Sequence, residues 1–287
     1  MALFAQVFCN GVLLGGLYAA MALGLALVWG VLNIVNLAHG AFIMLGAYVS
    51  WYLYADAHVD PFLGLPVSAA VLFAIGYALQ RGLLNRIVRG PMFNTLLITF
   101  GLEVAITYLA QAAFSADFRT INPPYAGNSV TLGGVTVPLA LAAAFVVAMV
   151  FTVAMWLLLL RTRLGREIRA TAQNLVAARL YGVEPRHLYA VTFGLGLALA
   201  GASGGLYGMV SQINPYIGGP LTAKSFAISI IGGLDNPLGV IVGGIFLGVV
   251  ESLTKLYIGP TYADVASFGI LVLVLVVRPS GLLGRTA

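Results

Sequence analysis

One polar stretch in an otherwise apolar sequence organises this chain: residues 161–187, which read RTRLGREIRATAQNLVAARLYGVEPRH. The stretch holds six of the 14 basic residues and two of the 9 acidic ones. A long apolar run ends just before it, and another begins just after it. Because charged side chains are costly inside a bilayer, we expect this stretch to lie in water between two membrane spans.

The middle of the stretch is predicted to form one short helix. Positions spaced i, i+4, i+7, i+8 and i+11 share a helix face. Here that face carries mostly small side chains in place of large apolar ones, and it consists of Ala170, Asn174, Ala177, Ala178 and Tyr181. Gly182 can adopt the positive φ of a helix C-cap, and Pro185 prevents continuation. The helix belongs either to a solvated loop whose arginines set the topology or to a docking element for a cytosolic partner.

The composition places the chain among membrane proteins. Hydrophobic residues make up 61% of it, charged residues 8%, and the mean hydropathy is +1.00. A soluble domain of 287 residues could not cover so much apolar surface. We therefore expect an all-α polytopic membrane protein in which residues 1–287 form a single transmembrane domain. The lone Cys9 excludes a disulfide framework or a cysteine metal site, and no aromatic and basic platform suggests a nucleic-acid partner.

Nine segments are long and apolar enough, fully or marginally, to cross about 30 Å of hydrocarbon. We therefore expect eight or nine membrane crossings. The second and seventh segments are short and interrupted by glycine, which indicates discontinuous helices, and the many other glycines favour close helix packing in lipid. The predicted spans are 7–31, 38–54, 62–81, 93–114, 138–160, 187–210, 217–234, 237–257 and 262–278.

Basic residues in the connections predict the orientation of the spans. Arg81, Arg86 and Arg89 mark one cytoplasmic connection, and residues 161–187 form another. The C-terminus is predicted to be cytoplasmic and the N-terminus external. The nearly neutral connection 115–137 is predicted to be an external loop, and its turn signals fit either a small hairpin or a simple linker.

Two interruptions of the apolar pattern, residues 33–40 and 230–237, bear on a substrate pathway. Non-helical backbone at membrane depth survives only where it is buried in protein or lines a wet cavity, and transporters place substrate sites at such breaks. Polar residues in or beside the spans are therefore candidates for lining a pathway: Asn36, His39, Glu103, Lys224, Asp235 and Asn236.

Structural roles compete with the pathway role for some of these residues. Glu103 and Lys224 either neutralise each other across the bundle or line the pathway. Glu251 and Lys255 are spaced i, i+4 and are expected to pair with each other. His39 is better explained as a satisfied residue of the helix break than as a ligand.

Several motifs, in order along the chain, resemble one transporter family. The stretch beginning GREIRA (165–170) is similar to the cytoplasmic coupling loop of permease subunits in ATP-binding-cassette importers of the branched-chain amino acid type. Other motifs look like the N-terminal signature, the C-terminal half and the tail of these permeases: NGVLLGGLYA (10–19), NLAHG (36–40), NPYIG (214–218) and RPSGLLGR (278–285). The resemblance covers nearly the whole chain.

The resemblance implies a transport subunit, not an enzyme, in a bacterial inner membrane. It implies three kinds of partner: a second permease (the same chain or a sister), two cytosolic ATPases, and a periplasmic solute-binding protein. The chain itself is expected to need no cofactor, because ATP and magnesium belong to the ATPases. The residues implied to couple the permease to the ATPases are Arg169, Ala170, Asn174, Ala177, Ala178, Tyr181 and Gly182.

The expected solutes are branched-chain or other hydrophobic amino acids. The main alternative is a stand-alone channel or an ion-coupled carrier, which would have no use for a cytosolic docking helix. A rhomboid-type serine protease is excluded, because no histidine base follows Ser203 in the sequence. No Gly-x-x-x-x-Gly-Lys-Ser/Thr motif occurs, so ATP hydrolysis would have to take place in another chain.

Overall fold

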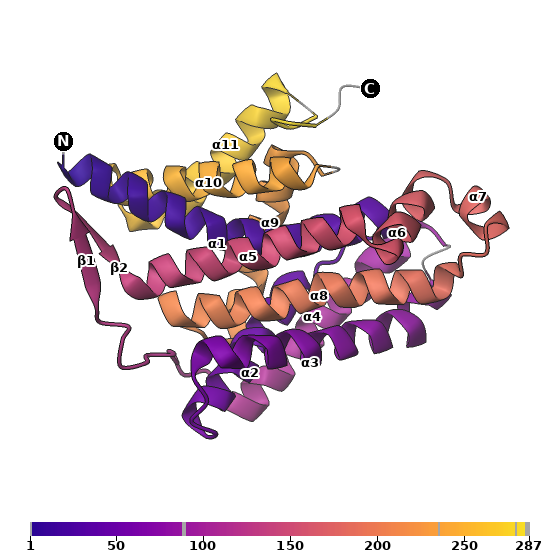
Figure 1. Cartoon of the computed structure of the whole chain (residues 1–287), viewed down its shortest axis with the longest axis horizontal. Helices are drawn as coiled ribbons and strands as arrows, with labels where there is room; N and C mark the ends of the chain where they lie inside the picture. Colours follow the sequence, from indigo (N-terminus) through magenta and orange to yellow (C-terminus); the bar gives the residue numbers. More distant parts are fainter. Residues whose placement is uncertain (1, 88–89, 235, 279, 285–287) are drawn as a thin grey trace.

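The described residues form a bundle of α-helices with one short β-hairpin (Figure 1). The computed structural model describes residues 2–87, 90–234, 236–278 and 280–284. Its α-helices are α1 (Ala2–Leu32), α2 (His39–Ala55), α3 (Pro61–Gly82), α4 (Met92–Phe114), α5 (Leu139–Arg161), α6 (Arg163–Gln173), α7 (Leu175–Leu180), α8 (Pro185–Val210), α9 (Gly218–Gly232), α10 (Pro237–Tyr257) and α11 (Ala263–Val277). The strands are β1 (Ser129–Leu132) and β2 (Val135–Pro138), and the 3₁₀ turns are η1 (Leu84–Arg86), η2 (Pro215–Ile217) and η3 (Pro260–Tyr262).

Seven of the described helices, α1, α3, α4, α5, α8, α10 and α11, are long and apolar enough to cross a membrane. The predicted all-α multi-pass membrane fold is therefore confirmed. Helix α2 has 17 residues and α9 has 15, so at 1.5 Å per residue they extend only about 25 and 23 Å. Both are shorter than the hydrocarbon core of about 30 Å. The expected eight or nine crossings thus exceed the seven full-length spans, because the second and seventh predicted segments form the short helices α2 and α9.

Helices α1 and α8 form the buried centre of the bundle and lie along its long axis (Figure 1). In the most apolar window of each helix, 83% of α1 and 78% of α8 is buried, against 17% of α4 and of α11. A side chain at Gly15 of α1 or Gly244 of α10 would overlap the backbone of the other helix, and one at Gly204 of α8 would overlap Ile43 of α2. Small residues thus allow the close backbone packing that associates helices in lipid.

The segment between α1 and α2 is clamped by two threonines from other helices. Thr99 of α4 accepts the N–H of Leu37 at 3.2 Å and donates to the carbonyl of Val35 at 2.9 Å. Thr222 of α9 accepts the N–H of Gly40 at 2.7 Å and donates to the carbonyl of Leu37 at 3.0 Å. Neighbouring side chains therefore satisfy this non-helical backbone, as membrane burial requires.

The segment between α9 and α10 is held by the C-terminal tail. Gly233 ends α9 with a φ of +99°, a conformation that glycine adopts without steric cost. The N–H of Leu282 then donates to the carbonyl of Ile231 at 2.7 Å, and that of Leu283 to Gly232 at 3.3 Å. Both predicted interruptions of the apolar helices are therefore present.

The connection between α4 and α5 contains the antiparallel hairpin β1–β2, one of the two forms expected for it. Gly133 and Gly134 have φ values of +58° and +85°, the positive values that a tight hairpin turn requires. Gln6 of α1 exchanges two hydrogen bonds with Thr136 of the hairpin, at 2.5 and 2.6 Å. The hairpin is thereby fixed to the first residues of α1, as Figure 1 shows.

The residues before the hairpin are tied to the same end of the bundle. The backbone of Arg119 bridges that of Ile213, with hydrogen bonds of 2.9 and 2.8 Å. The hydroxyl of Tyr125 donates to the carboxylate of Asp60 at 2.9 Å. Burial and then this carboxylate raise the pKa of Tyr125, so the hydroxyl stays protonated and keeps donating.

Candidate functional site

The polar stretch 161–187 forms two helices, α6 and α7, where one was predicted. Asn174 lies between them in an extended conformation, with a φ of −153°, and its side chain accepts the N–H of Ala177 at 3.0 Å. Thr162 caps α6 in the same way by accepting the N–H of Gly165 at 3.0 Å. The prediction of one continuous helix is therefore wrong, because Asn174 acts as an N-cap that starts a new helix.

The end of α7 follows the prediction. Gly182 has a φ of +84°. Its N–H donates to the carbonyl of Arg179 at 3.0 Å, and the N–H of Val183 donates to Ala178 at 3.1 Å. This pair of bonds is the Schellman motif that closes a helix on a glycine. Pro185 is then the first residue of α8, so the helix cap predicted at Gly182 is confirmed.

An open groove of about 460 Å³ lies between α6 and α7. Five of the seven residues implied to couple the permease to the ATPases line it: Ala170, Asn174, Ala177, Ala178 and Tyr181. Charged side chains of Arg163, Arg166 and Glu167 also border it. Arg169 is half-buried on α6, and neither Arg169 nor Gly182 belongs to the groove lining. The break at Asn174 therefore still leaves most of the small-residue face assembled.

Large apolar side chains around α7 are left exposed. The exposed fraction is 90% for Tyr181, 84% for Leu180 and 67% for Val176. Ala178, by contrast, is only 3% exposed and forms the floor of the groove. Clustered apolar side chains on a polar segment that does not span the membrane indicate a contact surface. We call the groove lining together with these exposed side chains the α6–α7 face.

Asn36 and His39, two of the candidate pathway residues, are fully buried at the break between α1 and α2. Within the part of the chain that the structure describes, neither side-chain polar atom of Asn36 has a hydrogen-bond partner. His39 Nε2 lies 2.9 Å from the carbonyl of Met21, whereas Nδ1 is likewise unpartnered there. The expectation of a fully satisfied His39 is thus met at one ring nitrogen only. The break retains hydrogen-bonding capacity that these neighbours do not use.

Glu103 lies on a polar stripe of α4. Thr95, Thr99 and Thr107 occur at intervals of four residues on either side of it and are buried against the bundle, whereas Glu103 is half-buried. Among the described residues, no ion pair or hydrogen bond engages its carboxylate. We call Thr95, Thr99, Glu103 and Thr107 the α4 stripe. An ionisable group at this depth belongs on an interior or wet surface, because lipid would penalise its charge.

Lys224 pairs with residues other than Glu103. Its Nζ lies 3.0 Å from Oε2 of Glu251 and 3.2 Å from Oδ1 of Asp264. The Glu103–Lys224 pair, one of the two arrangements considered for these residues, is therefore not formed in the described structure. Periodicity along one helix could not reveal this, because Lys224 lies on α9 and its two partners come from α10 and α11.

Two further contacts complete this group. Nζ of Lys255 lies 2.6 Å from Oε1 of Glu251, so the predicted i, i+4 pair is confirmed. The hydroxyl of Tyr18 donates to the same oxygen at 3.3 Å. We call Tyr18, Lys224, Glu251, Lys255 and Asp264 the four-helix charge cluster, because they join α1, α9, α10 and α11. Two cations balance two carboxylates, so the contacts favour a structural role for Lys224.

Of the last two candidates, Asp235 lies outside the described residues. Asn236 accepts the N–H of Leu238 at 3.1 Å and donates to the carbonyl of Leu283 at 3.0 Å. It therefore caps α10 and holds the C-terminal tail, a structural role at the second break.

Sequence reasoning missed four residues that organise these polar regions. Thr99 and Thr222 clamp the first break, while Tyr18 and Asp264 complete the charge cluster. The available signal was a polar side chain inside or beside an apolar span. That signal marks a residue as notable but does not identify its partner.

Comparisons with known proteins agree with the sequence motifs. Residues 7–275 match the family described as "Branched-chain amino acid transport system / permease component". The high-affinity branched-chain amino acid transport system permease protein BraD of Pseudomonas aeruginosa is 32% identical, over 98% of this chain and 96% of its own. The corresponding permease LivH of Escherichia coli is 31% identical over the same shares. Permease LivM of Escherichia coli is 26% identical over 94% of this chain and 68% of its own.

One solved structure is more distantly similar: a chain of "PsaBC from Streptococcus pneumoniae in complex with Fab". It covers 93% of this chain and 91% of its own, with 14% sequence identity and a TM-score of 0.47. The family assignment does not depend on it, because the family match and the curated relatives extend over nearly the whole chain. This chain is a multi-pass membrane protein that belongs to the permease component family of branched-chain amino acid transport systems.

Proposed function

We propose that ATPase subunits of an ATP-binding-cassette importer dock on the α6–α7 face of this permease. One observation carries the proposal: a groove floored by small side chains is flanked by exposed Val176, Leu180 and Tyr181 on a segment outside the spans. A groove lined by small residues admits a partner helix, and exposed apolar side chains gain by being buried against it.

Helix α6 is attached to the bundle firmly enough to transmit a movement. A side chain at Gly165 would overlap the carbonyl groups of Leu158 and Leu159 at the end of α5. Ile168 of α6 is 1% exposed, and the hydroxyl of Thr162 donates to the carbonyl of Leu158 at 2.6 Å. A displacement of the α6–α7 face would therefore carry α5 with it. In our proposal, ATP-driven closure of the ATPases switches the accessibility of the bundle in this way.

The proposed topology places the α6–α7 face in the cytoplasm. Six arginines and two glutamates give residues 161–187 a net positive charge, which the positive-inside rule assigns to the cytoplasmic side. The C-terminus is proposed to lie on the same side and the hairpin end on the opposite, external side. The corresponding location is the inner membrane of a bacterial cell.

The proposed assembly contains a second permease, two ATPases and a periplasmic solute-binding protein. ATP and magnesium are held by the ATPases, and this chain contributes no group to hydrolysis. The relatives named LivH and LivM are both permease proteins of Escherichia coli, which supports pairing with the same or a sister permease. The peripheral helices α4 and α11 expose apolar surface that could contact a second permease. The hairpin end is where the solute-binding protein would deliver its ligand.

The proposed solutes are branched-chain or other hydrophobic amino acids, as the names of the relatives suggest. Asn36, His39 and Glu103 are the proposed pathway residues. The α4 stripe contacts the first break at Thr99, whose hydroxyl accepts the N–H of Leu37. The Glu103 carboxylate lies one helix turn from Thr99, and together with the unpaired polar atoms of Asn36 and His39 at the break it would suit a solute that carries both an ammonium and a carboxylate. Lys224 and Asn236 are better explained by the structural contacts described above.

The docking proposal is tested by a charge placed in the groove. Ala170 is exposed and lines the groove, whereas Ala172 is exposed on the same helix but does not line it. We expect Ala170→Asp to lower the substrate-stimulated ATPase activity of the reconstituted importer at least tenfold, and Ala172→Asp to retain it. Ala178 is less suitable, because a charge at a side chain that is 3% exposed would also damage packing.

Replacing alanine by aspartate costs the same intrinsic helix propensity at both positions. A difference in ATPase activity between the two variants therefore reports on the charge in the groove. Normal stimulation in Ala170→Asp would overturn the docking model. If the chain purifies without any ATPase even after crosslinking through residues 161–187, a stand-alone channel or ion-coupled carrier becomes the better explanation, and flux assays would follow.

A further inference from the structure

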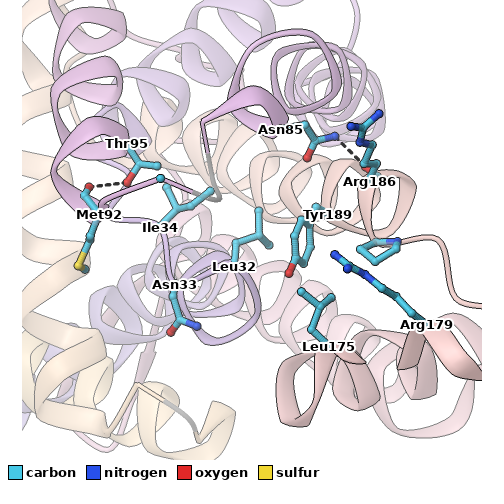
Figure 2. A pocket seen from close by; sticks show the side chains of 12 residues that line it. Leu32, Asn33, Ile34, Asn85, Met92, Thr95, Leu175, Arg179, Arg186 and Tyr189 are labelled. Atoms are coloured by element: carbon cyan, nitrogen blue, oxygen red, sulfur yellow. Dashed lines mark hydrogen bonds between the residues drawn. The ribbon is translucent and has the colours of Figure 1, made fainter. Parts of the chain in front are cut away.

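A second hollow, with a volume of about 490 Å³, lies where α1 ends and where α4, α7 and α8 begin (Figure 2). Its volume is within the range of about 300–1,000 Å³ typical of small-molecule sites. Helix α7 contributes Leu175 and Arg179 to this cavity, whereas Ala177 and Ala178 line the groove of the α6–α7 face. The two hollows therefore lie against different sides of α7, and we call the second one the α1–α8 cavity.

The lining of the α1–α8 cavity combines apolar walls with cationic and neutral polar groups. Leu32, Ile34 and Met92 provide apolar surface, and the two cations are Arg179 and Arg186. None of the described residues that line the cavity is acidic. Figure 2 shows the guanidinium end of Arg179 directed toward the cavity, beside Tyr189. The cavity is thus suited to a ligand with both an apolar part and a negative charge.

Helix ends add to the positive potential. The first turns of α4 and α8 border the cavity, through Met92 and Thr95 of α4 and Arg186 of α8. The N–H groups of a first turn have no partner within the helix and carry about half a positive charge together. The end of α1 at Leu32 contributes the opposite, negative end of one helix. Two helix starts and two arginines outweigh it, so an anion is favoured.

The cavity lies at the level of the membrane surface. The apolar spans α1 and α3 end beside it, and α4 and α8 begin there, so it lies at the boundary between hydrocarbon and water. Asn85, in the turn after α3, donates to the carbonyl of Arg186 at 2.9 Å and closes one side, as the dashed line in Figure 2 shows. Basic pockets between helices at this level bind the head groups of anionic lipids.

We propose that the α1–α8 cavity binds a phosphate-bearing anion, with an anionic phospholipid of the adjacent leaflet as its source. The guanidinium group of Arg179 would contact the phosphate, since arginine can donate two parallel hydrogen bonds to it, and Arg186 would add positive charge at the edge of the cavity. The apolar walls would contact the glycerol and the first part of the acyl chains. Phosphatidylglycerol carries the required single negative charge.

The bound lipid would also brace α7. This helix has only six residues and projects from the bundle (Figure 1). A lipid between Arg179 and the starts of α4 and α8 would fix the position of α7 from the side opposite the groove. This consequence rests on the proposed docking function, whereas lipid binding itself does not.

The test uses the purified permease alone, without ATPases. The protein is placed in mixed micelles with either phosphatidylglycerol or the neutral phosphatidylcholine, and the retained lipid is counted by native mass spectrometry. A parallel calorimetric titration with glycerol 3-phosphate asks whether a soluble phosphate also binds. The variant is Arg179→Gln/Arg186→Gln, and the control Arg161→Gln/Arg166→Gln removes two exposed arginines that do not line the cavity.

We expect the wild type and the control to retain phosphatidylglycerol in preference to phosphatidylcholine, and the cavity variant to lose affinity about tenfold or more. Binding of glycerol 3-phosphate as well would support the site and add a soluble source, while its absence would assign the site to lipid alone. The proposal is overturned if the cavity variant retains phosphatidylglycerol as well as the wild type does, or if the wild type shows no preference. Neither outcome depends on ATPase docking.

Discussion

The four-helix charge cluster and the α6–α7 face are both polar regions of an apolar chain, but their polar groups find partners in different places. In the cluster, Glu251 is 1% exposed and its carboxylate meets Lys224, Lys255 and Tyr18. On the α6–α7 face, the ion pair found among the described residues is Arg163–Glu167, with the arginine side chain 88% exposed.

This difference separates structural polarity from polarity available to a partner. The cluster neutralises itself and connects four helices, so it adds little that another molecule could bind. On the α6–α7 face, arginines and large apolar side chains are exposed to solvent. Much of the face's binding capacity is therefore unused within the chain. Polar residues in a membrane protein are therefore best judged by whether the chain satisfies them itself.

The largest expected effect follows from breaking the cluster. Glu251→Leu would leave Lys224, whose side chain is 14% exposed, with the exposed Asp264 as its remaining ion-pair partner. Because removing one member of a buried pair leaves an uncompensated charge, we expect a loss of about 3–5 kcal/mol in unfolding free energy. Thermal unfolding in detergent measures it as a lowered midpoint.

The double variant Lys224→Met/Glu251→Leu sharpens this test. It removes both charges, so it should be clearly more stable than Glu251→Leu alone. If Glu251→Leu alone lowered the unfolding free energy by less than about 1 kcal/mol, the cluster would not be what holds the four helices together.

A smaller and local effect is expected on the α6–α7 face. Asn174→Ala removes the side chain that caps α7, which costs about 1 kcal/mol. Hydrogen exchange at the amide of Ala177, the capped group, should become about fivefold faster, while the unfolding midpoint of the bundle stays unchanged. Gln173→Ala, an exposed neighbour without a cap contact, serves as the control. Equal exchange in both variants would show that Asn174 does not set the helix break.

The smallest effect is expected at the exposed ion pair. Glu167→Gln should change the unfolding free energy by about 0.5 kcal/mol or less, because solvent screens the Arg163–Glu167 pair. The unfolding midpoint of this variant should therefore stay close to that of the wild type at both low and high salt. A loss comparable to that of Glu251→Leu would remove the distinction between the two regions.

Much of the fold is predictable from local patterns in the sequence. Apolar runs identify the spans, glycine and polar residues identify the two breaks, and Gly182 identifies the end of α7. The Glu251–Lys255 pair is also predictable, because a spacing of four residues places both side chains on one helix face. Each of these predictions depends on neighbours along the chain.

The failures have a common physical origin in contacts between distant segments or in competing local hydrogen bonds. Lys224 finds Glu251 and Asp264 on other helices, which spacing along α9 cannot reveal. Asn174 fits a helix face by spacing, yet its side chain binds the backbone and starts a new helix, as asparagine often does. The α1–α8 cavity was not predicted for the same reason, since α1, α4, α7 and α8 meet only in the folded chain.

The most direct test of the account is crosslinking from the α6–α7 face. Cys9 is the one cysteine in the chain, so a Cys9→Ser background accepts a single new cysteine at Leu180, whose side chain is 84% exposed. We predict that Leu180→Cys, treated with a short bifunctional reagent in native membranes, forms an adduct with an ATPase subunit. A cysteine in place of Val272, which is 60% exposed on the membrane span α11, should form no adduct with an ATPase subunit. Failure of Leu180→Cys to form that adduct, although the site can be labelled, would contradict the proposal that this face is where the permease meets its ATPases.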